Sequence, residues 1–398
     1  MAALPGDWDG LVVFHAANSW DSVKFADQHL AEALSRLVPV LYVDPPISFL
    51  TPLKRPEARA ALRQPRLRLL APGLARLTPV SLPGMERPGM AAITTVLVRR
   101  AMARAARSLV GRDGVRAVIA ASVLVPTLGA CGERLGVYWA QDDFVGGAEL
   151  FGSSAERISS GELRLAAAAD LIVASNPVVA DAWRGRGRAD TLLIPFGADA
   201  ERFAATDQAP PAGDVELPAP VVGFVGHLGD RIDLRLLEAV ADSGRSLLLV
   251  GPRHPRFELE RMEQLLARAN VQWVGPKQFE ALPSYLRAID VGLVPYADSA
   301  FNRGSFPLKT LEYLAAGRGV VATDLPAIRW LVEQAAGRDG LIEVASEPAD
   351  YAAAVERALS TGREAEAVAR RRAFAAEHSW ARRAEAFAAA LGVAPARR

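Results

Sequence analysis

The chain has 398 residues, of which 51% are hydrophobic and 23% charged, a composition typical of a globular protein with two domains rather than of a disordered chain. Its single cysteine, Cys131, excludes an internal disulfide framework and a cysteine-based zinc site, and favours the reducing cytoplasm. The chain does not start with a basic segment and an apolar run, and no window reaches the roughly 18 apolar residues of a membrane-spanning helix, so we expect neither a signal peptide nor a membrane span.

Positive charge is concentrated in one part of the chain, although the net charge is only +1. Residues 52–117 contain fourteen Lys or Arg against three Asp or Glu, an excess of eleven positive charges. Many of these arginines alternate with Leu, Val and Ala, so helices here can carry a basic face beside an apolar one. An anionic membrane surface and an ordinary solvated surface both fit this pattern. We expect no nucleic-acid partner, because no recognition-helix, RNP or zinc-finger pattern accompanies the charge.

In chain order, the first expected elements are a buried strand at 10–15, a helix over 21–37 and a strand at 39–44. Such a unit is a parallel β-α-β motif, in which ligands bind beyond the carboxyl ends of the strands. His15 lies at that position and is a candidate general base, although a polar residue that merely ends a strand fits as well. No Gly-x-Gly-x-x-Gly follows the strand, which disfavours a dinucleotide site of that type.

Further strands are expected at 115–122 and 136–140, and two carboxylates, Asp142 and Asp143, directly follow the second of them. A carboxylate at the end of a parallel strand can serve as a catalytic base. Asp is also common there as a turn former or helix cap. Both interpretations remain open for this pair.

A domain boundary is expected at 204–220, where four prolines lie among small and acidic residues. This composition is typical of a linker. The first domain is then expected to be 1–203 and the second 221–375.

The second domain opens with Val221-Val-Gly-Phe-Val-Gly-His-Leu-Gly229, a buried strand that leads into a turn containing Gly226 and Gly229. Glycine lets the main chain approach a ligand closely, although a tight turn without a ligand has the same pattern. Arg253 follows the next strand and Tyr296 ends a later one. Because the carboxyl ends of parallel strands meet at one edge, we expect these positions to converge.

The stretch 305–323 combines a fixed turn, a charged helix face and a buried strand. Pro307 suits the first position of a helix that continues from Leu308, and Lys309 and Glu312 are expected together on the face away from the core. A helix N-terminus attracts phosphate through its unsatisfied N–H groups, and a lysine strengthens that attraction. The alternative is an ordinary Glu–Lys pair on a surface helix.

The pattern Pro-x-Lys-x-x-Glu-Tyr-Leu-Ala-Ala-Gly followed by Val-Val, at 307–321, resembles the donor-binding signature of GT-B glycosyltransferases, particularly the teichuronic-acid type and relatives in exopolysaccharide assembly. The resemblance covers nearly all of 221–331 and is patchier in the first domain. It implies an α/β fold with two Rossmann-like parallel-sheet lobes facing across a cleft, and a final helix, 376–398, that packs back on the first lobe. It also implies transfer of a sugar from a nucleotide-sugar donor to an acceptor hydroxyl.

The same resemblance implies roles for individual residues. Lys309 meets the diphosphate, Glu312 meets the ribose, and an acidic residue after strand 136–140 faces the sugar. The implied donor-binding residues are Gly226, His227, Arg253, Lys277, Tyr296, Pro307, Leu308, Lys309 and Glu312, and the catalytic candidates are Asp142, Asp143 and His15. We expect no metal and no cofactor besides the donor substrate, because no Asp-x-Asp or His/Cys cluster is present.

One departure from the family pattern concerns stereochemistry. Many retaining GT-B enzymes carry two Glu separated by seven residues, and the position eight before Glu312 is Gly304, which favours inversion. The alternatives are a GT-B epimerase or phosphorylase, and an inactive nucleotide-sugar-binding partner of another transferase. The acceptor is expected to be a glycan, a lipid-linked molecule or a small molecule, in the cytoplasm, with the basic stretch as a candidate contact with the inner face of the membrane.

Overall fold

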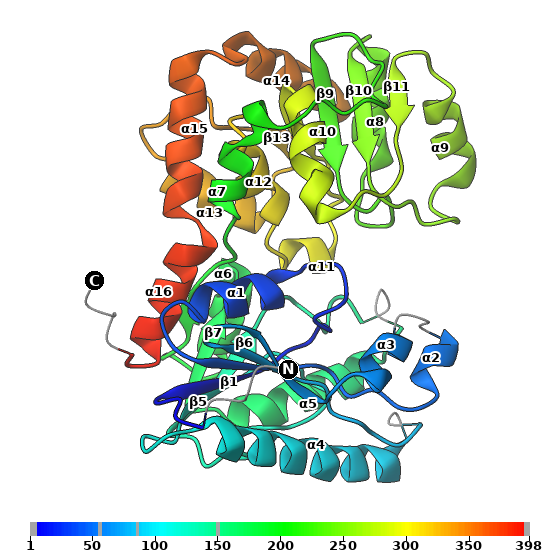
Figure 1. Ribbon diagram of the computed structural model, residues 1–398. Helices are drawn as coiled ribbons and strands as arrows, with labels where there is room; N and C mark the ends of the chain where they lie inside the picture. The colour runs from blue at the N-terminus through cyan, green and yellow to red at the C-terminus, as the bar shows by residue number, and fades with distance from the viewer. Residues whose placement is uncertain (1–5, 55–57, 85–86, 149–151, 394–398) are drawn as a thin grey trace. The chain divides into compact units, whose positions relative to one another are not determined.

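The computed structural model describes residues 6–54, 58–84, 87–148 and 152–393 (Figure 1). The chain divides into two compact units, Met1–Pro195 with Ala381–Arg398, and Phe196–Trp380. Each unit is built on its own largely parallel sheet covered by helices, which confirms the predicted α/β fold class. Three charged residues of the basic stretch, Arg55, Glu57 and Glu86, lie outside the described residues.

The first unit contains an eight-stranded sheet in the order β3-β4-β2-β1-β5-β6-β7-β8. Its strands are β1 (Leu11–His15), β2 (Val40–Val43), β3 (Leu67–Ala71), β4 (Leu74–Leu77), β5 (Val115–Ala120), β6 (Leu135–Ala140), β7 (Leu171–Ala174) and β8 (Leu192–Leu193). All neighbouring strands are parallel except β3 and β4, which form an antiparallel hairpin at the edge of the sheet. The sequence pattern does not reveal this hairpin, because arginines interrupt its apolar residues.

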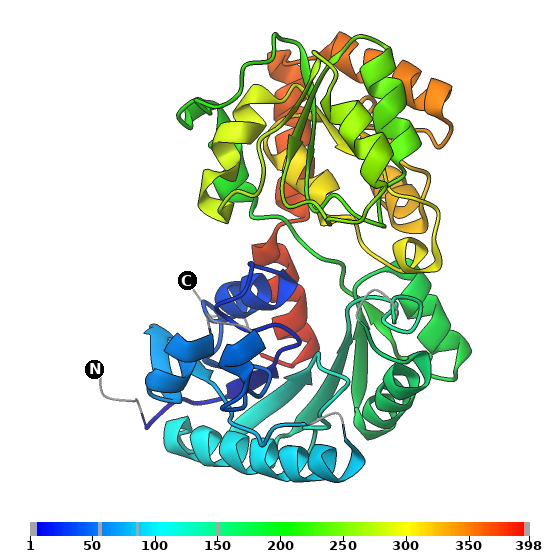
Figure 2. The same cartoon turned by 90° about the vertical axis from the view of Figure 1, so that its right-hand side faces the viewer.

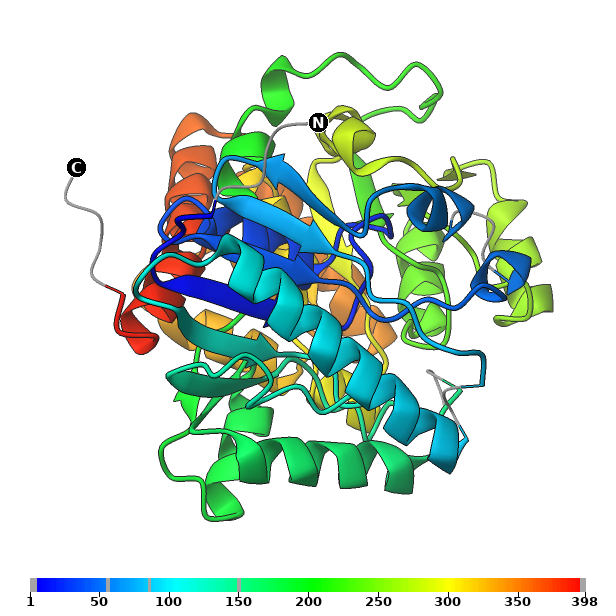
Figure 3. The ribbon, with the colours of Figure 1, turned by 60° about the horizontal axis from the view of Figure 1, so that its bottom comes forward.

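The helices of the first unit are α1 (Ala26–Leu34), α2 (Thr51–Lys54), α3 (Ala58–Arg63), α4 (Pro88–Leu109), α5 (Ala155–Ala168) and α6 (Pro177–Gly185). Figure 3 shows α4 lying across one face of the sheet. The helix buries Val98, Met102 and Leu109 in the core of this unit, because these residues recur at helical spacing on one side. No helix of the described residues is long and apolar enough to span a membrane.

The segment between β1 and α1 is a loop, and α1 begins at Ala26 rather than near residue 21 as the pattern predicts. Two buried carboxylates hold this loop. Asp27 accepts hydrogen bonds from the main-chain N–H groups of Ala17 and Asn18 in this loop, at 3.0 and 2.8 Å. Asp44 accepts one from Trp20 at 2.8 Å and pairs with the fully buried Arg76 at 2.6 Å. Because these bonds fix the loop, the helix starts only after it.

The second unit contains a six-stranded, wholly parallel sheet in the order β11-β10-β9-β12-β13-β14. Its strands are β9 (Val221–Val225), β10 (Ser246–Val250), β11 (Val271–Trp273), β12 (Val291–Val294), β13 (Gly319–Ala322) and β14 (Ile342–Val344). Its helices are α7 (Ala200–Ala204), η1 (Thr206–Gln208), α8 (Leu234–Asp242), α9 (Leu259–Leu266), η2 (Phe279–Ala281), α10 (Leu282–Ala288), α11 (Ala300–Arg303), α12 (Leu308–Ala315), α13 (Pro326–Gln334), α14 (Pro348–Thr361) and α15 (Ala365–Glu377). Figure 2 shows these strands nearly edge-on between α8 and α10.

The two faces of β12 contact different helices. Val291 and Leu293 point into the core that also contains residues of α8 and α14. Gly292 lies on the other face, directly under the ring of Tyr313 from α12. The Tyr313 hydroxyl accepts a hydrogen bond from the main-chain N–H of Val225 at 2.8 Å. A glycine on β12 therefore lets α12 pack closely against two strands.

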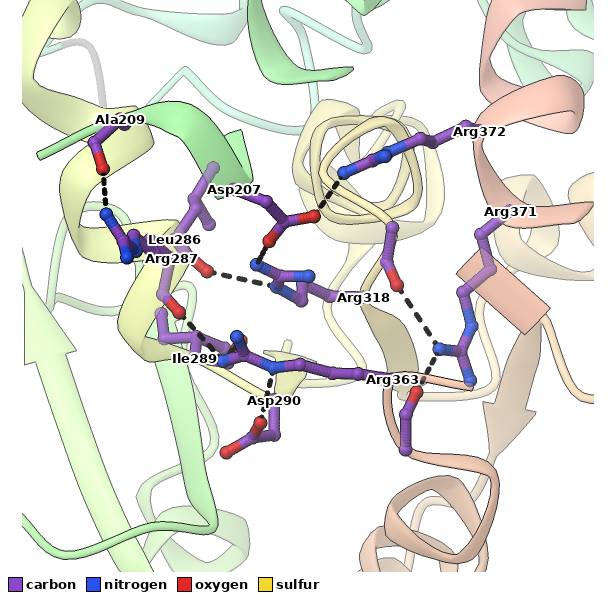
Figure 4. A network of polar contacts seen from close by, with 12 residues as sticks. Asp207, Ala209, Leu286, Arg287, Ile289, Asp290, Arg318, Arg363, Arg371 and Arg372 are labelled. Atoms are coloured by element: carbon purple, nitrogen blue, oxygen red, sulfur yellow. Dashed lines mark hydrogen bonds and ion pairs between the residues drawn. The ribbon is translucent and has the colours of Figure 1, made fainter. Parts of the chain in front are cut away.

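The segment 204–220, expected as a linker from its composition, belongs to the second unit and packs on it (Figure 4). Asp207 pairs with the fully buried Arg318 at 2.6 Å and with Arg372 of α15. Burial alone would raise the pKa of Asp207, but the hydrogen bonds and charges of the two arginines outweigh it and hold this pKa low. A carboxylate paired in this way fixes its segment to the helices around it.

The last helix, α16 (Trp380–Ala390), spans the division between the units. Trp380 belongs to the second unit, where its ring lies 6.0 Å from that of Phe196. Phe387 belongs to the first unit and makes an edge contact with Trp139 at 5.5 Å between ring centroids.

We expect Gly292→Ala to destabilise the protein. The new Cβ would lie 2.2 Å from the Tyr313 ring, so the strand or α12 must move, and such overpacking costs about 1–3 kcal/mol. Urea unfolding or the Tm measures the loss. The matched control is Gly185→Ala at the end of α6, where a Cβ meets no atom within 4 Å, and where stability should hold or rise by about 0.5–1 kcal/mol. A Gly292→Ala protein as stable as wild type would contradict this account of the packing.

Candidate functional site

The loops after β9, β10 and β12 are joined to one another at the carboxyl edge of the second sheet. Main-chain hydrogen bonds of 2.8 to 2.9 Å run from Gly226 to Val250, from Leu228 to Pro252, from Asp233 to Pro295 and from Ala297 to Arg231. Three loops that are distant in sequence thus form one connected surface. Parallel α/β sheets bind their ligands at this edge.

Two glycines make this surface possible. Gly251 has φ +137, a conformation that favours glycine, and a Cβ there would lie 2.0 Å from the carbonyl oxygen of Gly226. A Cβ at Gly226 would in turn lie 2.7 Å from the Phe224 ring. The main chains at Gly226 and Gly251 therefore approach each other more closely than any side chain at either position would allow.

Arg231 is held rigidly between these loops. Its guanidinium stacks on the rings of Tyr296 and Phe301, at 4.7 and 4.9 Å from their centroids. Its Nε donates to Asn302 Oδ1 at 2.8 Å and its Nη2 donates to Ser305 Oγ at 3.1 Å. The residue is only half-buried. A half-buried, pre-oriented guanidinium is well suited to bind a phosphate or carboxylate.

Lys309 and Glu312 form an ion pair on α12, with 2.6 Å between Nζ and Oε2. The Lys309 side chain is 24% exposed, whereas that of Glu312 is only 6% exposed. The expectation that both lie on a face away from the core is therefore wrong for Glu312, and the pairing with an ammonium is what makes its burial tolerable. Pro307 is the N-cap rather than the first helical residue, and it provides no side-chain acceptor for the first turn. An anion can take that place.

The remaining predicted donor residues divide into two groups. His227 is largely exposed. Partial loss of its hydration lowers its pKa, and the charge of His254 lowers it further. Arg253 stacks on the Trp273 ring at 5.4 Å. Both lie on the connected loops. Lys277, in contrast, is engaged by Asp214 at 2.6 Å, and this hydrogen bond raises the pKa of Lys277.

Among the catalytic candidates, His15 is fully buried at the end of β1. Its Nδ1 lies 3.1 Å from Thr127 Oγ1, and its Nε2 is buried without a hydrogen-bond partner within the described part of the chain. Burial lowers the pKa of His15 to about 4, so the imidazole is neutral at pH 7 and a weak base. A general base works best with a pKa near the working pH, which disfavours His15.

The two aspartates after β6 differ in their local structure. Asp143 Oδ1 accepts a hydrogen bond from the N–H of Gly146 at 2.8 Å, which is the turn-forming role that the sequence leaves open. Asp142 is half-buried, and its carbonyl oxygen accepts from the N–H of Phe144 at 2.9 Å.

Three charged residues at or near these sites are not apparent from the sequence. Arg231 reads as an ordinary residue before a helix. Asp27 reads as an ordinary carboxylate within the helix expected at 21–37, but it is buried and also accepts from Gln141 after β6. Glu162 on α5 is buried, accepts from the Tyr138 hydroxyl at 3.1 Å, and has a pKa raised to about 7 by burial, with a contribution from the charge of Asp143. No sequence pattern marks the last two, because their burial depends on tertiary packing.

Comparison with known proteins shows which part of the chain resembles a known family. Residues 219–361 match the family model "Glycosyl transferases group 1". The chain is 32% identical over 213 residues to the putative teichuronic acid biosynthesis glycosyltransferase TuaH of Bacillus subtilis, which covers 51% of each chain. The chain spans about half the length of the curated relatives it matches first.

Solved structures match over nearly the whole chain. Sucrose-phosphate synthase from Thermosynechococcus elongatus has a TM-score of 0.68 and 17% identity, with 96% of this chain and 98% of that chain covered. HepE of Anabaena, in complex with UDP-glucose, has a TM-score of 0.64 and 17% identity over 96% and 99% of the two chains. The chain has the GT-B fold, and its residues 219–361 match the model of the glycosyl transferases group 1 family.

Proposed function

We propose that this chain is a glycosyltransferase that moves a sugar from a nucleotide-sugar donor, bound at the α12 site of the second unit, to an acceptor hydroxyl. The observation that carries the proposal is the pre-oriented positive charge of that site. Lys309 and Arg231 accompany a helix N-terminus that has no side-chain cap, in the segment that matches the group 1 family. A structure of the same fold in complex with UDP-glucose supports this class of donor.

The chemistry follows from the charges. The reaction breaks the bond between the anomeric carbon and a diphosphate oxygen, forms a bond to the acceptor oxygen and transfers the hydroxyl proton to a base. Negative charge develops on the departing diphosphate, where Lys309, Arg231 and the first turn of α12 stabilise it. In this proposal Glu312 accepts a hydrogen bond from a ribose hydroxyl of the donor, while Lys309 contacts the diphosphate.

The base is proposed to come from the first unit, where the acceptor binds at the carboxyl edge of the sheet. Asp142 or Asp143 is preferred over His15, because burial makes the imidazole a weak base. The position eight before Glu312 is Gly304, which caps α11. Many retaining GT-B enzymes have a Glu there, and its replacement by glycine favours an inverting reaction.

Two rival functions are separable by product analysis. An epimerase would change the donor sugar without an acceptor, and a catalytically inactive partner would bind donor without consuming it.

For the acceptor we propose a cell-surface glycan precursor, a glycolipid or a natural product, handled in the cytoplasm or at the inner face of the membrane. The similarity to a putative teichuronic acid enzyme supports the glycan.

The first functional prediction concerns Lys309→Ala, measured by calorimetry with the sugar nucleotide that most raises Tm in a screen of UDP-, GDP- and TDP-sugars. Loss of one charge-assisted contact to diphosphate should weaken donor binding by about 1.5–3 kcal/mol. Lys24→Ala is the matched control, because Lys24 has the same 2.6 Å ion pair and a similar 22% exposure but lies in the first unit. Wild-type donor affinity and turnover in Lys309→Ala would refute the phosphate site.

The second functional prediction is full turnover in excess EDTA, because side-chain cations and the α12 N-terminus neutralise the diphosphate in the proposed mechanism. Initial rates with and without chelator measure this. Activity that disappears with EDTA and returns with magnesium or manganese would contradict the metal-independent mechanism.

The third functional prediction compares the base candidates. Asp142→Asn or Asp143→Asn should lower kcat by at least about tenfold with donor affinity nearly unchanged, and His15→Ala should do less. Asparagine keeps the oxygen that accepts from Gly146, so the Asp143 change removes the charge and preserves the turn. If instead only His15→Ala loses turnover, and the kcat of the wild-type protein falls as the pH is lowered through about 4, His15 is the base.

A further inference from the structure

Large apolar side chains of the first unit are exposed to solvent within residues 49–53 and at residue 62. Leu53 is 75% exposed and Phe49 is 64% exposed, and Leu50 and Leu62 follow at 43% and 36%. These four residues belong to α2, α3 and the turn before α2, and the two short helices contact each other. We call Phe49, Leu50, Leu53 and Leu62 the apolar ridge. Large, contiguous exposed apolar side chains mark interaction surfaces.

The base of this ridge is anchored rather than loose. Ile47, just before it, pairs with the segment after β4: its N–H donates to Pro79 at 3.0 Å, and its carbonyl oxygen accepts from Ser81 at 2.9 Å. Ser48 N–H donates to Thr51 Oγ1 at 2.8 Å, which fixes the start of α2. The exposure of Phe49 and Leu53 is thus imposed by a fixed main chain.

Basic residues lie close to the ridge in the sequence: residues 49–66 contain five Lys or Arg and one Glu. Among them, Arg59 and Arg63 on α3 and Arg66 just after it are exposed. Projecting apolar groups with a basic surround complement the interface of an anionic bilayer, where apolar side chains enter the acyl boundary and arginines meet lipid phosphates.

We propose that the apolar ridge and Arg59, Arg63 and Arg66 form a docking surface for an anionic phospholipid membrane. In the first unit Val23 and Phe25 are also exposed, at 74% and 48%, but Lys24 between them is paired with Glu32. On the exposed face of α4, with Ile93, Val96 and Arg104, no large apolar side chain is more than 46% exposed. Docking through the ridge goes beyond the proposed sugar transfer, because it requires neither donor nor acceptor.

The test is co-sedimentation of the full chain with phosphatidylcholine vesicles that do or do not contain phosphatidylglycerol. Wild type should bind the anionic vesicles at low salt and release as the Debye length shrinks to about 3 Å at 1 M salt. The triple variant Phe49→Ser, Leu50→Ser, Leu53→Ser should bind at least about tenfold more weakly. Arg59→Gln with Arg63→Gln should lose about fivefold per arginine and much of the salt dependence.

Two control variants separate the ridge from general effects. Leu259→Ser on α9 removes an apolar side chain of similar exposure, 47%, from the second unit, and Leu97→Ser with Arg104→Gln alters α4. Both should bind vesicles as wild type does, and all variants should keep the wild-type Tm. Equal recovery from neutral and anionic vesicles, full binding by the ridge variants, or loss of binding in the α4 variant alone would overturn the proposal. Vesicle binding and sugar transfer are measured separately, so either can fail without the other.

Discussion

The contact between the Tyr313 ring and Gly292 fixes α12, the helix on which the proposed donor site depends. Because β12 has no side chain at that position, α12 lies close enough to the sheet for the Tyr313 hydroxyl to reach the N–H of Val225 at the end of β9. The same contact places Lys309 and Glu312 beside the loop after β12. A bulkier residue at position 292 would move the whole helix, and with it the positive N-terminal end where we propose that the donor diphosphate binds.

The charges of the second unit are arranged around this helix at both ends. At its N-terminus, Lys309 and the stacked Arg231 provide cations where a phosphate can bind. At its C-terminus, Arg371 donates to the carbonyl oxygen of Gly317 at 3.2 Å, and Arg318 is fixed by Asp207 (Figure 4). Cations are favourable at the C-terminus of a helix because its carbonyl groups are unsatisfied there. Arg318 and Arg371 therefore have a structural role at the C-terminus of α12 that requires no ligand.

The sequence predicts the parallel strands well, since their apolar runs are uninterrupted and their length is short, as the buried β9, β10 and β13 illustrate. It also predicts the α12 motif, because Pro307, Lys309 and Gly317 each have a local conformational or electrostatic meaning. It fails where tertiary contacts decide. Asp207 lies in a proline-rich segment that reads as a linker, and only the buried Arg318, more than a hundred residues later, shows why it packs. Asp27 likewise becomes a loop anchor only once the fold brings Gln141 to it.

The most direct test of the central claim is hydrogen exchange of the full chain, measured by mass spectrometry with and without UDP-, GDP- or TDP-glucose. If the donor binds where Lys309 and Arg231 lie, the effective nucleotide sugar should slow exchange in peptides that cover 226–231 and 305–313. A bound donor suppresses the local opening motions through which the main-chain N–H groups at its binding site exchange. Protection confined to the first unit, or a nucleotide sugar that is consumed while both segments exchange as in the free protein, would contradict the account.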